Sequence, residues 1–286
     1  MTKQQIRKSL IIVPTFGLLV AFAGAHHGRA INGIPVFMIC VGWAFLINWL
    51  AFIPAYRSQT EKYYDLTGSL TYISVTIIAL VLSDSMDVRS VLLATLVMIW
   101  ATRLGTFLFR RVQEAGKDDR FDAIKPNFFR FLNAWTIQAL WVTLTAAPAI
   151  IAITAMKRVD IGTFAIIGLI MWAMGFAIEV VADYQKTQFR KNPANKGKFI
   201  QTGLWSRSRH PNYFGEILLW VGVTIIAVPV LQGWQWVGLI SPVFVTLLLT
   251  RVSGVPMLEA KAEKKWGGQA DYEAYKKETP VLVPKI

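Results

Sequence analysis

Long apolar blocks, each about as long as a membrane-crossing helix, occupy most of this 286-residue chain. Crossing the hydrocarbon layer of a bilayer takes about 20 helical residues, and a helix pairs its own backbone polar groups there. We therefore expect an all-α fold, a polytopic membrane helical bundle with seven or eight transmembrane helices. The candidate spans are Leu10–Ala25, Pro35–Ile53, Leu66–Leu82, Val88–Leu108, Ala134–Ile153, Ile161–Val181, Gly215–Leu231 and Trp234–Arg251.

Composition supports this prediction. Hydrophobic residues make up 54% of the chain and charged residues 16%, whereas soluble domains carry about 25% charged residues. We interpret the chain as a single membrane domain over residues 1–286. It has amino-terminal helices over residues 1–108 and a carboxyl-terminal part with polar loops over residues 134–286.

The distribution of basic residues predicts how the helices are oriented. If eight helices start from a cytoplasmic amino terminus, the opposite side of the membrane holds four basic residues, Arg29, Arg89, Lys157 and Arg158, and Arg103 lies inside a span. Basic loops are retained in the cytoplasm, so we expect the long charged loops to face the cytoplasm. This topology also explains the net charge of +13, and no nucleic-acid partner is expected.

The first apolar run has two interpretations. Lys3, Arg7 and Lys8 precede Leu10–Ala25, a pattern that also fits a secretory signal peptide. We prefer an uncleaved first helix, because the rest of the chain is equally apolar. Removal of this segment would leave seven helices.

Arg103 lies inside a predicted span, about two helical turns before Arg110. A charge within a span is costly and indicates a functional site by default. An arginine near a helix end can instead extend its charge to the interface, and the sequence leaves both interpretations open.

The sequence predicts no metal site. His26 and His27 are adjacent, project in different directions and have no third ligand nearby, and Cys40 is the single cysteine. A small buried hydrophobic role fits Cys40 better than a reactive one.

Polar residues share one face at the end of the sixth predicted helix. Glu179, Asp183, Lys186 and Arg190 follow one another at helical spacing. A carboxylate followed by an arginine two turns later can hold a ribose or an amide at one end and a phosphate at the other. The alternative is a surface ion pair, which the depth of Glu179 and Asp183 makes the weaker reading.

The densest group of chemically active residues precedes the seventh predicted helix. Pro211 sets a turn, and helix amino termini attract anions. Arginines can grip phosphates through two hydrogen bonds. A positively charged loop would explain the arginines but not the amide, phenol and carboxylate beside them. The group consists of Arg207, Arg209, His210, Asn212, Tyr213 and Glu216.

The carboxyl-terminal segment begins with Arg251 at the end of the last predicted span and continues through Glu259. Trp266, Tyr272 and Tyr275 follow. Aromatic residues at such spacing are typical of a segment that lies along a membrane surface.

Together these segments resemble the carboxyl-terminal domain of steroid 5α-reductases and related sterol reductases, and most closely the uncharacterised bacterial branch of that superfamily. The likeness covers about the second half of the chain, with a weaker likeness around Arg103, and the order and spacing of several motifs agree. The motifs are Asp183-Tyr184, Phe189-Arg190-Lys191, Gly203-Leu204-Trp205, Asn212-Tyr213-Phe214-Gly215-Glu216, Arg251 and a tail with Tyr272, Pro280 and Pro284.

The resemblance implies a reductase of the bacterial inner membrane that binds NADPH on the cytoplasmic side. It would transfer hydride to the β-carbon of a conjugated enone and add a proton at the α-carbon. The cofactor would supply the chemistry, and the protein would supply position and electrostatics. A steroid-like or lipid-like substrate would lie in an apolar chamber among helices surrounded by membrane lipids. The candidate cofactor-binding residues are Arg103, Glu179, Asp183, Arg190, Arg207, Arg209, His210, Asn212, Tyr213, Arg251 and Glu259. The candidate catalytic residues are Asp65, Trp100, Tyr213 and Glu216.

The chain departs from the family pattern at three positions. Trp100 stands where the steroid enzymes have a tyrosine that holds the substrate carbonyl, and Glu259 stands where their tail has a tyrosine. Asp65 is our candidate for the family's substrate-side glutamate. These departures put a steroid substrate in doubt, although the cofactor assignment does not depend on them.

Two other function classes compete with the reductase. Arg209-His210-Pro211, Tyr213 and the later Glu259 also resemble isoprenylcysteine and phospholipid methyltransferases, which use S-adenosylmethionine. The resemblance to reductases accounts for Asp183, Arg190 and Glu216 better than the resemblance to methyltransferases does. A transporter or scaffold is disfavoured, because no pair of similarly broken helices marks a site at the membrane midplane.

Overall fold

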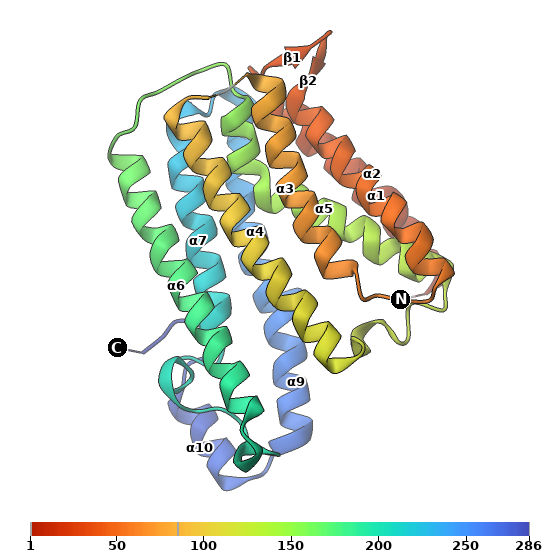
Figure 1. The fold of residues 1–286 in the computed structure, drawn as a ribbon, viewed down its shortest axis with the longest axis vertical. Helices are drawn as coiled ribbons and strands as arrows, with labels where there is room; N and C mark the ends of the chain where they lie inside the picture. Colours follow the sequence, from red (N-terminus) through yellow and green to blue (C-terminus); the bar gives the residue numbers. More distant parts are fainter. Residues whose placement is uncertain (1, 85, 286) are drawn as a thin grey trace. The chain divides into compact units, whose positions relative to one another are not determined.

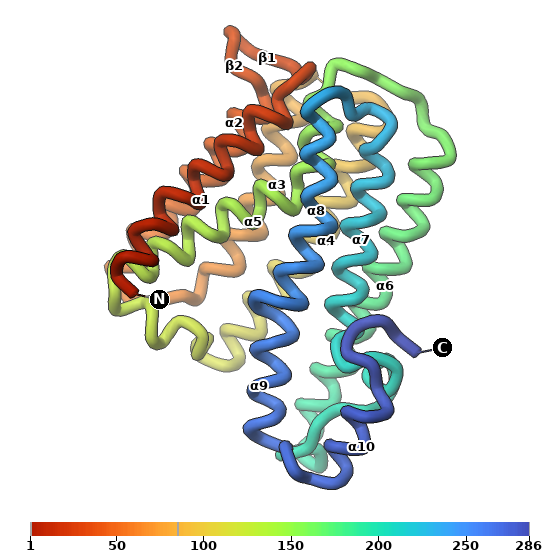
Figure 2. Tube along the Cα trace, turned by 180° about the vertical axis from the view of Figure 1, so that it is seen from behind, coloured from red at the N-terminus to blue at the C-terminus, as the bar shows by residue number. Residues whose placement is uncertain are grey.

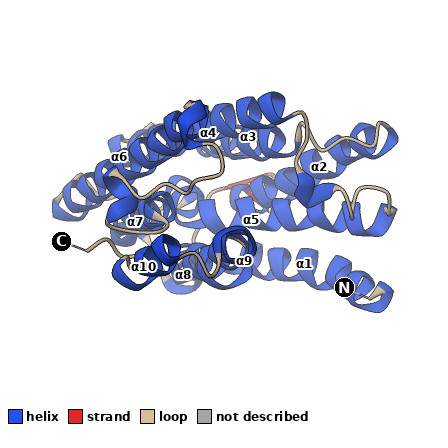
Figure 3. Ribbon diagram, turned by 90° about the horizontal axis from the view of Figure 1, so that it is seen from below, coloured by secondary structure: helices blue, strands red, loops and turns tan. Residues whose placement is uncertain are grey.

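The computed structural model describes residues 2–84 and 86–285, which fold almost entirely into helices (Figures 1 and 3). Within these residues the only strands form a short antiparallel hairpin of β1 (Ala30–Ile31) and β2 (Ile34–Pro35). The helices are α1 (Lys3–Gly24), α2 (Val36–Arg57), α3 (Tyr64–Ser83), α4 (Val88–Ala115), α5 (Phe128–Thr154), α6 (Thr163–Lys191), α7 (Pro211–Ala227), α8 (Ile240–Leu247), α9 (Gly254–Trp266) and α10 (Ala270–Glu278). Short 3₁₀ turns lie at Asp119–Phe121, Pro193–Asn195, Gly203–Ser206, Val228–Val230 and Gly233–Leu239.

Eight helical stretches of the described residues are long and apolar enough to cross a membrane. The predicted all-α fold is therefore confirmed, with the higher of the two expected helix counts. The first helix begins at Lys3 rather than at Leu10. Its start is set by Thr2 and Gln5, whose side chains each accept a hydrogen bond from the other's backbone N–H, an arrangement that caps helices.

The last predicted span, Trp234–Arg251, extends beyond Arg251 in the structure. The chain passes from α8 into a π-helical turn, Leu248–Val252, and then into α9. A π turn inserts an extra residue without leaving the helical path, and such turns are frequent at functional sites. The charge at Arg251 therefore does not end the helical stretch, which runs from Gly233 to Trp266.

The chain divides into two compact units, which are described separately. Unit 1 comprises residues 1–165 and 226–241, and unit 2 comprises residues 166–225 and 242–286. The predicted division into amino-terminal helices, residues 1–108, and a carboxyl-terminal part, residues 134–286, stays a prediction.

In unit 1, α5 packs against α1, α2, α3 and α4 (Figure 2). Its central residues, such as Leu144 and Ile151, are fully buried. Polar side chains also cross between these helices, because Asn48 donates to the Thr71 hydroxyl at 3.3 Å and Gln138 donates to the Tyr64 carbonyl at 2.9 Å. Such bonds hold apolar helices in register where hydrophobic burial alone distinguishes few arrangements.

Arg89 at the start of α4 is buried, although its position predicted a loop charge. Its guanidinium donates to the carbonyls of Val159 at 3.4 Å, Asp160 at 2.8 Å and Ile226 at 2.5 Å. Carbonyl oxygens are the acceptors that a buried guanidinium needs. Arg89 therefore ties the start of α4 to two distant segments of unit 1.

A group of ion pairs, the Glu61 cluster, holds the loop between α4 and α5. Glu61 accepts a hydrogen bond from the Asp118 N–H at 2.8 Å and from the Lys125 ammonium at 2.6 Å. Arg120 pairs with Asp118 at 2.5 Å and lies 3.7 Å from a carboxylate oxygen of Asp65. The cluster consists of these five residues, and it fastens a charged loop onto the start of α3.

In unit 2, α6 and α7 approach each other at glycines. A Cβ atom on Gly215 would lie 2.5 Å from the Gly175 carbonyl oxygen, and one on Gly222 would lie 2.5 Å from the Gly168 carbonyl oxygen. Only residues without a side chain permit this contact, which is typical of membrane helix pairs. The contact at Gly215 also brings the backbone of α7 against Glu179 of α6.

Candidate cofactor site

The polar face of α6 meets the first turn of α7 inside unit 2. Glu179 and Asp183 are buried, with 2% and 6% of their surfaces exposed. The Asn212 amide donates to an Asp183 carboxylate oxygen at 3.2 Å. Pro211 is the first residue of α7, which therefore begins four residues before the predicted span that started at Gly215. Two residues that are 29 positions apart thus form one hydrogen-bonding pair.

Arg209, His210 and Glu259 form a second group, the Glu259 cluster. Arg209 Nη1 lies 2.7 Å from one Glu259 carboxylate oxygen, and His210 Nε2 lies 2.7 Å from the other. Glu259 comes from α9, so the helix after the π turn supplies the acid that holds the loop before α7. The predicted residues Arg209, His210 and Glu259 are therefore adjacent in space.

The environment of His210 determines which of its ring nitrogens carries hydrogen. Burial lowers the pKa of His210, and the hydrogen bond to Glu259 opposes this only in part. The neutral ring donates from Nε2 to the carboxylate, which leaves Nδ1 as an acceptor. The ring also stacks on Tyr213, with centroids 5.6 Å apart and an angle of 8° between the planes.

Three buried polar atoms in this stretch have no hydrogen-bond partner among the described residues. They are Arg209 Nε, a donor, and His210 Nδ1 and Asn212 Oδ1, both acceptors. Leaving a buried polar atom unsatisfied costs about 1–3 kcal/mol, and folded proteins contain few such atoms. Their proximity in sequence indicates a site for a ligand with hydroxyl or amide groups that donate to the two acceptors.

The carboxyl-terminal tail holds the residues before α7 in place. The Arg209 N–H donates to the Pro280 carbonyl at 2.9 Å, and the Ser208 hydroxyl donates to the Leu282 carbonyl at 2.8 Å. The Lys285 N–H donates to the Arg207 carbonyl at 2.9 Å. This pairing fixes the backbone that carries Arg209 and His210.

Trp205 is a positioning residue to which the sequence analysis gave no role of its own. Its indole N–H donates to the Ala182 carbonyl at 3.0 Å, and its own carbonyl accepts from the Tyr275 hydroxyl at 2.6 Å. The Lys186 ammonium lies 4.2 Å from the Trp205 ring centroid. The Gly203-Leu204-Trp205 motif was the available signal, but its partners are far away in sequence.

Two of the tail aromatics, Tyr272 and Tyr275, pack against a ring from the loop after α6. Tyr272 is only 3% exposed, and its ring centroid lies 5.2 Å from that of Phe199. Tyr275 lies 5.4 Å from the same ring. The loop after α6 supplies this aromatic partner, which spacing alone could not reveal. The expected position of the segment along a membrane surface stays a prediction.

The other predicted residues of unit 2 lie around this region. Glu216 is 9% exposed and lies one turn into α7. Tyr213 packs against the start of α9, where a Cβ on Gly254 would lie 2.7 Å from its ring. Arg190, Arg207 and Arg251 are exposed, as cations must be to meet an incoming phosphate.

Three candidates, Asp65, Trp100 and Arg103, belong to unit 1. Asp65 faces Arg120 within the Glu61 cluster. Trp100 is 2% exposed, and its ring contacts that of Tyr72 edge to face at 5.1 Å. The Arg103 guanidinium lies 5.3 Å from the Phe107 ring centroid. Their participation in the same site as the residues of unit 2 stays a prediction.

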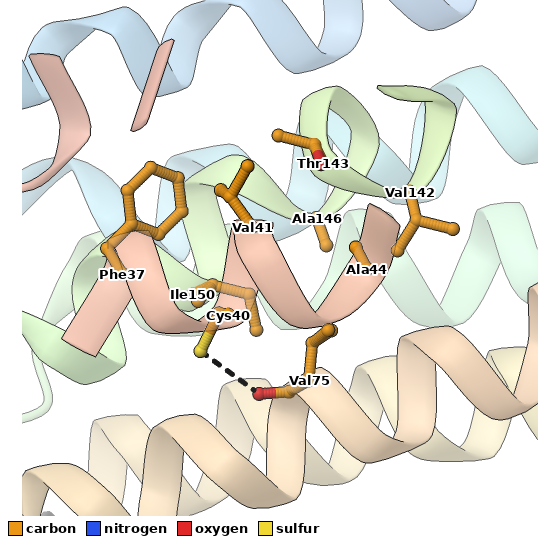
Figure 4. Close-up of a pocket in the computed structure, with 9 residues that line it drawn as sticks. All are labelled: Phe37, Cys40, Val41, Ala44, Val75, Val142, Thr143, Ala146 and Ile150. Carbon is orange, nitrogen blue, oxygen red and sulfur yellow. Dashed lines mark hydrogen bonds between the residues drawn. The ribbon is translucent and has the colours of Figure 1, made fainter. Parts of the chain in front are cut away.

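Unit 1 also contains an apolar cavity between α2, α3 and α5 (Figure 4). Phe37, Val41 and Ile150 are among its lining residues, and the Cys40 thiol donates to the Val75 carbonyl at 3.6 Å. The cavity volume is about 10 Å³, which is room for about one water molecule. This cavity therefore does not hold a lipid-like substrate.

Known relatives share parts of this chain. Steroid 5-alpha-reductase DET2 of Gossypium hirsutum is 29% identical over 119 residues, which cover 42% of this chain and 41% of the relative. Delta(14)-sterol reductase ERG24 of Saccharomyces cerevisiae is 30% identical over 146 residues, which cover 46% of this chain and 31% of the relative. Probable O-methyltransferase ustE of Ustilaginoidea virens is 48% identical over 46 residues, 16% of each chain.

The matched segments thus span less than half the length of each of these three relatives. No solved structure matches the chain. A family model described as "Protein of unknown function (DUF1295)" matches residues 51–279. The chain therefore belongs to that family and to the steroid 5α-reductase and sterol reductase superfamily.

Proposed function

We propose that this protein is an NADPH-dependent membrane reductase that transfers hydride to the C=C bond of a conjugated enone in a steroid-like or lipid-like substrate. The observation that carries the proposal is the Asp183–Asn212 pair beside the three unsatisfied atoms of Arg209, His210 and Asn212. The reductases among the relatives support the same reaction class.

The residues of unit 2 fit a phosphorylated dinucleotide. Ribose hydroxyls and a carboxamide can donate to His210 Nδ1 and Asn212 Oδ1, and phosphate oxygens can accept from Arg209 Nε. Asp183 would hold a ribose hydroxyl from the opposite side. Phosphates would meet the exposed cations Arg190, Arg207 and Arg251, and Arg103 of unit 1 stays a predicted phosphate ligand.

Bound NADPH would supply the hydride, and the chain's own groups would supply orientation and a proton path. The buried Glu216 and the Tyr213 phenol would line the reacting end of the site. On the substrate side, the Trp100 indole can donate a hydrogen bond to a carbonyl but is a poor acid. Asp65 would act there through its pairing with Arg120.

The proposed site faces the cytoplasm of a bacterial inner membrane. The segment between Asp183 and Glu216 contains seven basic residues and no acidic one. Such a segment stays on the cytoplasmic side during insertion, where NADPH is available. The substrate would enter from the surrounding lipid.

Thermal unfolding of the purified protein tests the cofactor. A ligand that binds only the native state raises its apparent stability. We expect NADPH to raise the unfolding temperature of the wild type and to have no effect on Arg190→Ala or Asn212→Ala, both of which remain folded.

Lys191→Ala is the matched control, because Lys191 is an exposed cation beside Arg190 on another helix face. This variant should keep the full NADPH shift. Unchanged shifts in both Arg190→Ala and Asn212→Ala would remove the assignment.

A methyltransferase is the second candidate, and the Glu259 cluster favours it specifically. The methyltransferase motif requires contacts among Arg209, His210 and Glu259, and these contacts are present. The O-methyltransferase relative supports the same candidate. S-adenosylmethionine also has ribose hydroxyls for the two acceptors, but it has no phosphate for the cations. Stabilisation by S-adenosylmethionine without stabilisation by NADPH would favour this candidate.

A further inference from the structure

Unit 2 contains a second cavity, the α6–α10 pocket, apart from the residues assigned above. It lies where the end of α6, the loop that follows and the turn between α9 and α10 come together, at one end of unit 2 (Figure 2). Phe189, Lys198, Phe199, Thr202, Trp266 and Asp271 are among the lining residues. Its volume is about 280 Å³, which is close to the lower size of small-molecule sites, about 300 Å³.

The aromatic wall of the pocket is held rigidly. The Trp266 indole donates to the Gly197 carbonyl at 2.6 Å. The Phe199 ring lies 5.7 Å from Trp266 and also contacts Tyr272 and Tyr275. A fixed aromatic surface is what a nucleobase needs, because stacking on it costs little side-chain entropy.

The polar lining matches the remaining groups of an adenosine phosphate. Gln201 and Thr202 offer donors and acceptors, and the Asp271 carboxylate can accept from an exocyclic amino group. Lys198 is the cation of the lining. It is exposed, so its charge is available to a phosphate at the mouth, and Asp271 is the one acid beside it in the lining.

The pocket lies within reach of the candidate cofactor site along one helix. Phe189 lies six positions after Asp183 on α6, a distance of about 9 Å along the helix axis. Lys186 lies between these two positions, and Arg190 follows directly. A diphosphate that joins two nucleoside ends would therefore pass basic side chains.

We infer that the α6–α10 pocket binds the adenosine end of the dinucleotide and that Lys198 contacts its 2′-phosphate. Lys198 is then the residue that makes the protein prefer the phosphorylated dinucleotide over NADH. This inference rests on the proposed function and adds a specificity-determining residue to it. It also separates the two candidate functions, because S-adenosylmethionine has no phosphate for Lys198.

The test compares Lys198→Ala with Lys196→Ala, titrated with NADPH and with NADH by calorimetry. Lys196 is an exposed cation two residues away that does not line the pocket. We expect Lys198→Ala to weaken NADPH binding about tenfold, the loss of one charge-assisted contact, and to change NADH binding less than about twofold. Lys198→Arg should restore NADPH binding, and Lys196→Ala should match the wild type.

If Lys198→Ala and Lys196→Ala weakened NADPH binding equally, the inference would be overturned. Lys198 would then contribute only to the overall positive charge of the loop. Equal weakening of NADPH and NADH by Lys198→Ala would also overturn it. In both cases the wild type still binds NADPH and the proposed function stands. A wild type that binds neither dinucleotide would remove the proposed function and this inference together.

Discussion

Two clusters of charged side chains, one in each unit, contrast in how completely they are satisfied. In the Glu61 cluster of unit 1, both oxygens of the buried Glu61 accept hydrogen bonds, and Arg120 reaches two carboxylates. In the Glu259 cluster of unit 2, the acid is also satisfied, but Arg209 Nε and His210 Nδ1 have no partner among the described residues. The first cluster is a closed hydrogen-bond network, which stabilises the fold. The two unpaired buried atoms of the second cluster are available to hydrogen-bond with a ligand.

The two regions look alike in sequence. Both are loops rich in charge beside a helix start, and Asp65 was a catalytic candidate in the first. In the structure Arg120 faces Asp65 across the cluster, and a catalytic role for Asp65 stays a prediction. The number of charges therefore does not separate fold from function in these two loops, whereas the unmet hydrogen bonds of Arg209 and His210 distinguish the second loop from the first.

Removal of Glu61, the central acid of the closed cluster, should have the largest effect on stability. Glu61→Ala leaves Lys125 without its 2.6 Å partner and the Asp118 N–H without an acceptor. Breaking a buried pair costs about 3 kcal/mol, so the unfolding temperature should fall clearly while the NADPH-induced shift remains.

Glu263→Ala provides the matched control, because Glu263 pairs with Lys276 at 2.7 Å in an exposed position. An exposed pair is worth less than about 1 kcal/mol. If both variants lost the same stability, the Glu61 cluster would not be the closed structural network described here.

The Glu61 cluster should also have a defined acid limit. Burial opposes the charged form of Glu61, but the hydrogen bonds from Lys125 and from the Asp118 N–H outweigh it and lower the pKa. A lowered carboxyl pKa gives stability that is present above the unfolded value of about 4.3 and is lost as pH falls through the folded value. The stability of Glu61→Ala should therefore fall less than that of the wild type as pH drops below about 4.3.

The open cluster should respond to pH through His210, with an intermediate effect. Burial lowers the pKa of His210 below its ordinary value of about 6.5. Above the lowered pKa the ring is neutral and Nδ1 accepts from a ligand, and below it protonation removes that acceptor. NADPH should therefore stabilise the wild type less as pH falls from about 7.5 towards and through this lowered value.

His210→Gln isolates this effect, because glutamine has no charge change in the range. Its NADPH affinity should be about tenfold weaker at neutral pH, the loss of one hydrogen bond, and should not fall further on acidification. The measurement is the NADPH-induced shift in unfolding temperature across a series of pH values, for the wild type and for His210→Gln. Glu259 is present in both proteins. A wild-type shift that is constant with pH would contradict the role given to Nδ1.

The smallest effect on cofactor affinity is expected for the phenol that stacks on His210. Tyr213→Phe keeps the ring 5.6 Å from the imidazole, so NADPH affinity should change less than about twofold. Tyr213→Leu removes the ring and should weaken binding more, because a stacked aromatic pair contributes about 0.5–1.5 kcal/mol. Calorimetry of the two variants side by side decides whether the ring or the hydroxyl matters for binding.

The sequence by itself determined the helical membrane fold, because each apolar block of about 20 residues meets the requirement of the bilayer independently of the others. It also determined which polar residues share the face of α6, since helical spacing is local. The family followed from the order of short motifs along the chain.

Only the tertiary structure decided how these pieces combine. Glu259 holds Arg209 and His210 across about 50 positions, Tyr275 holds Trp205 across 70, and Gly215 meets Gly175 because neither has a side chain. The structure also joined Asp65 to Arg120 and buried Tyr272. These contacts depend on which helix ends meet in space, and neither hydropathy nor local spacing encodes that.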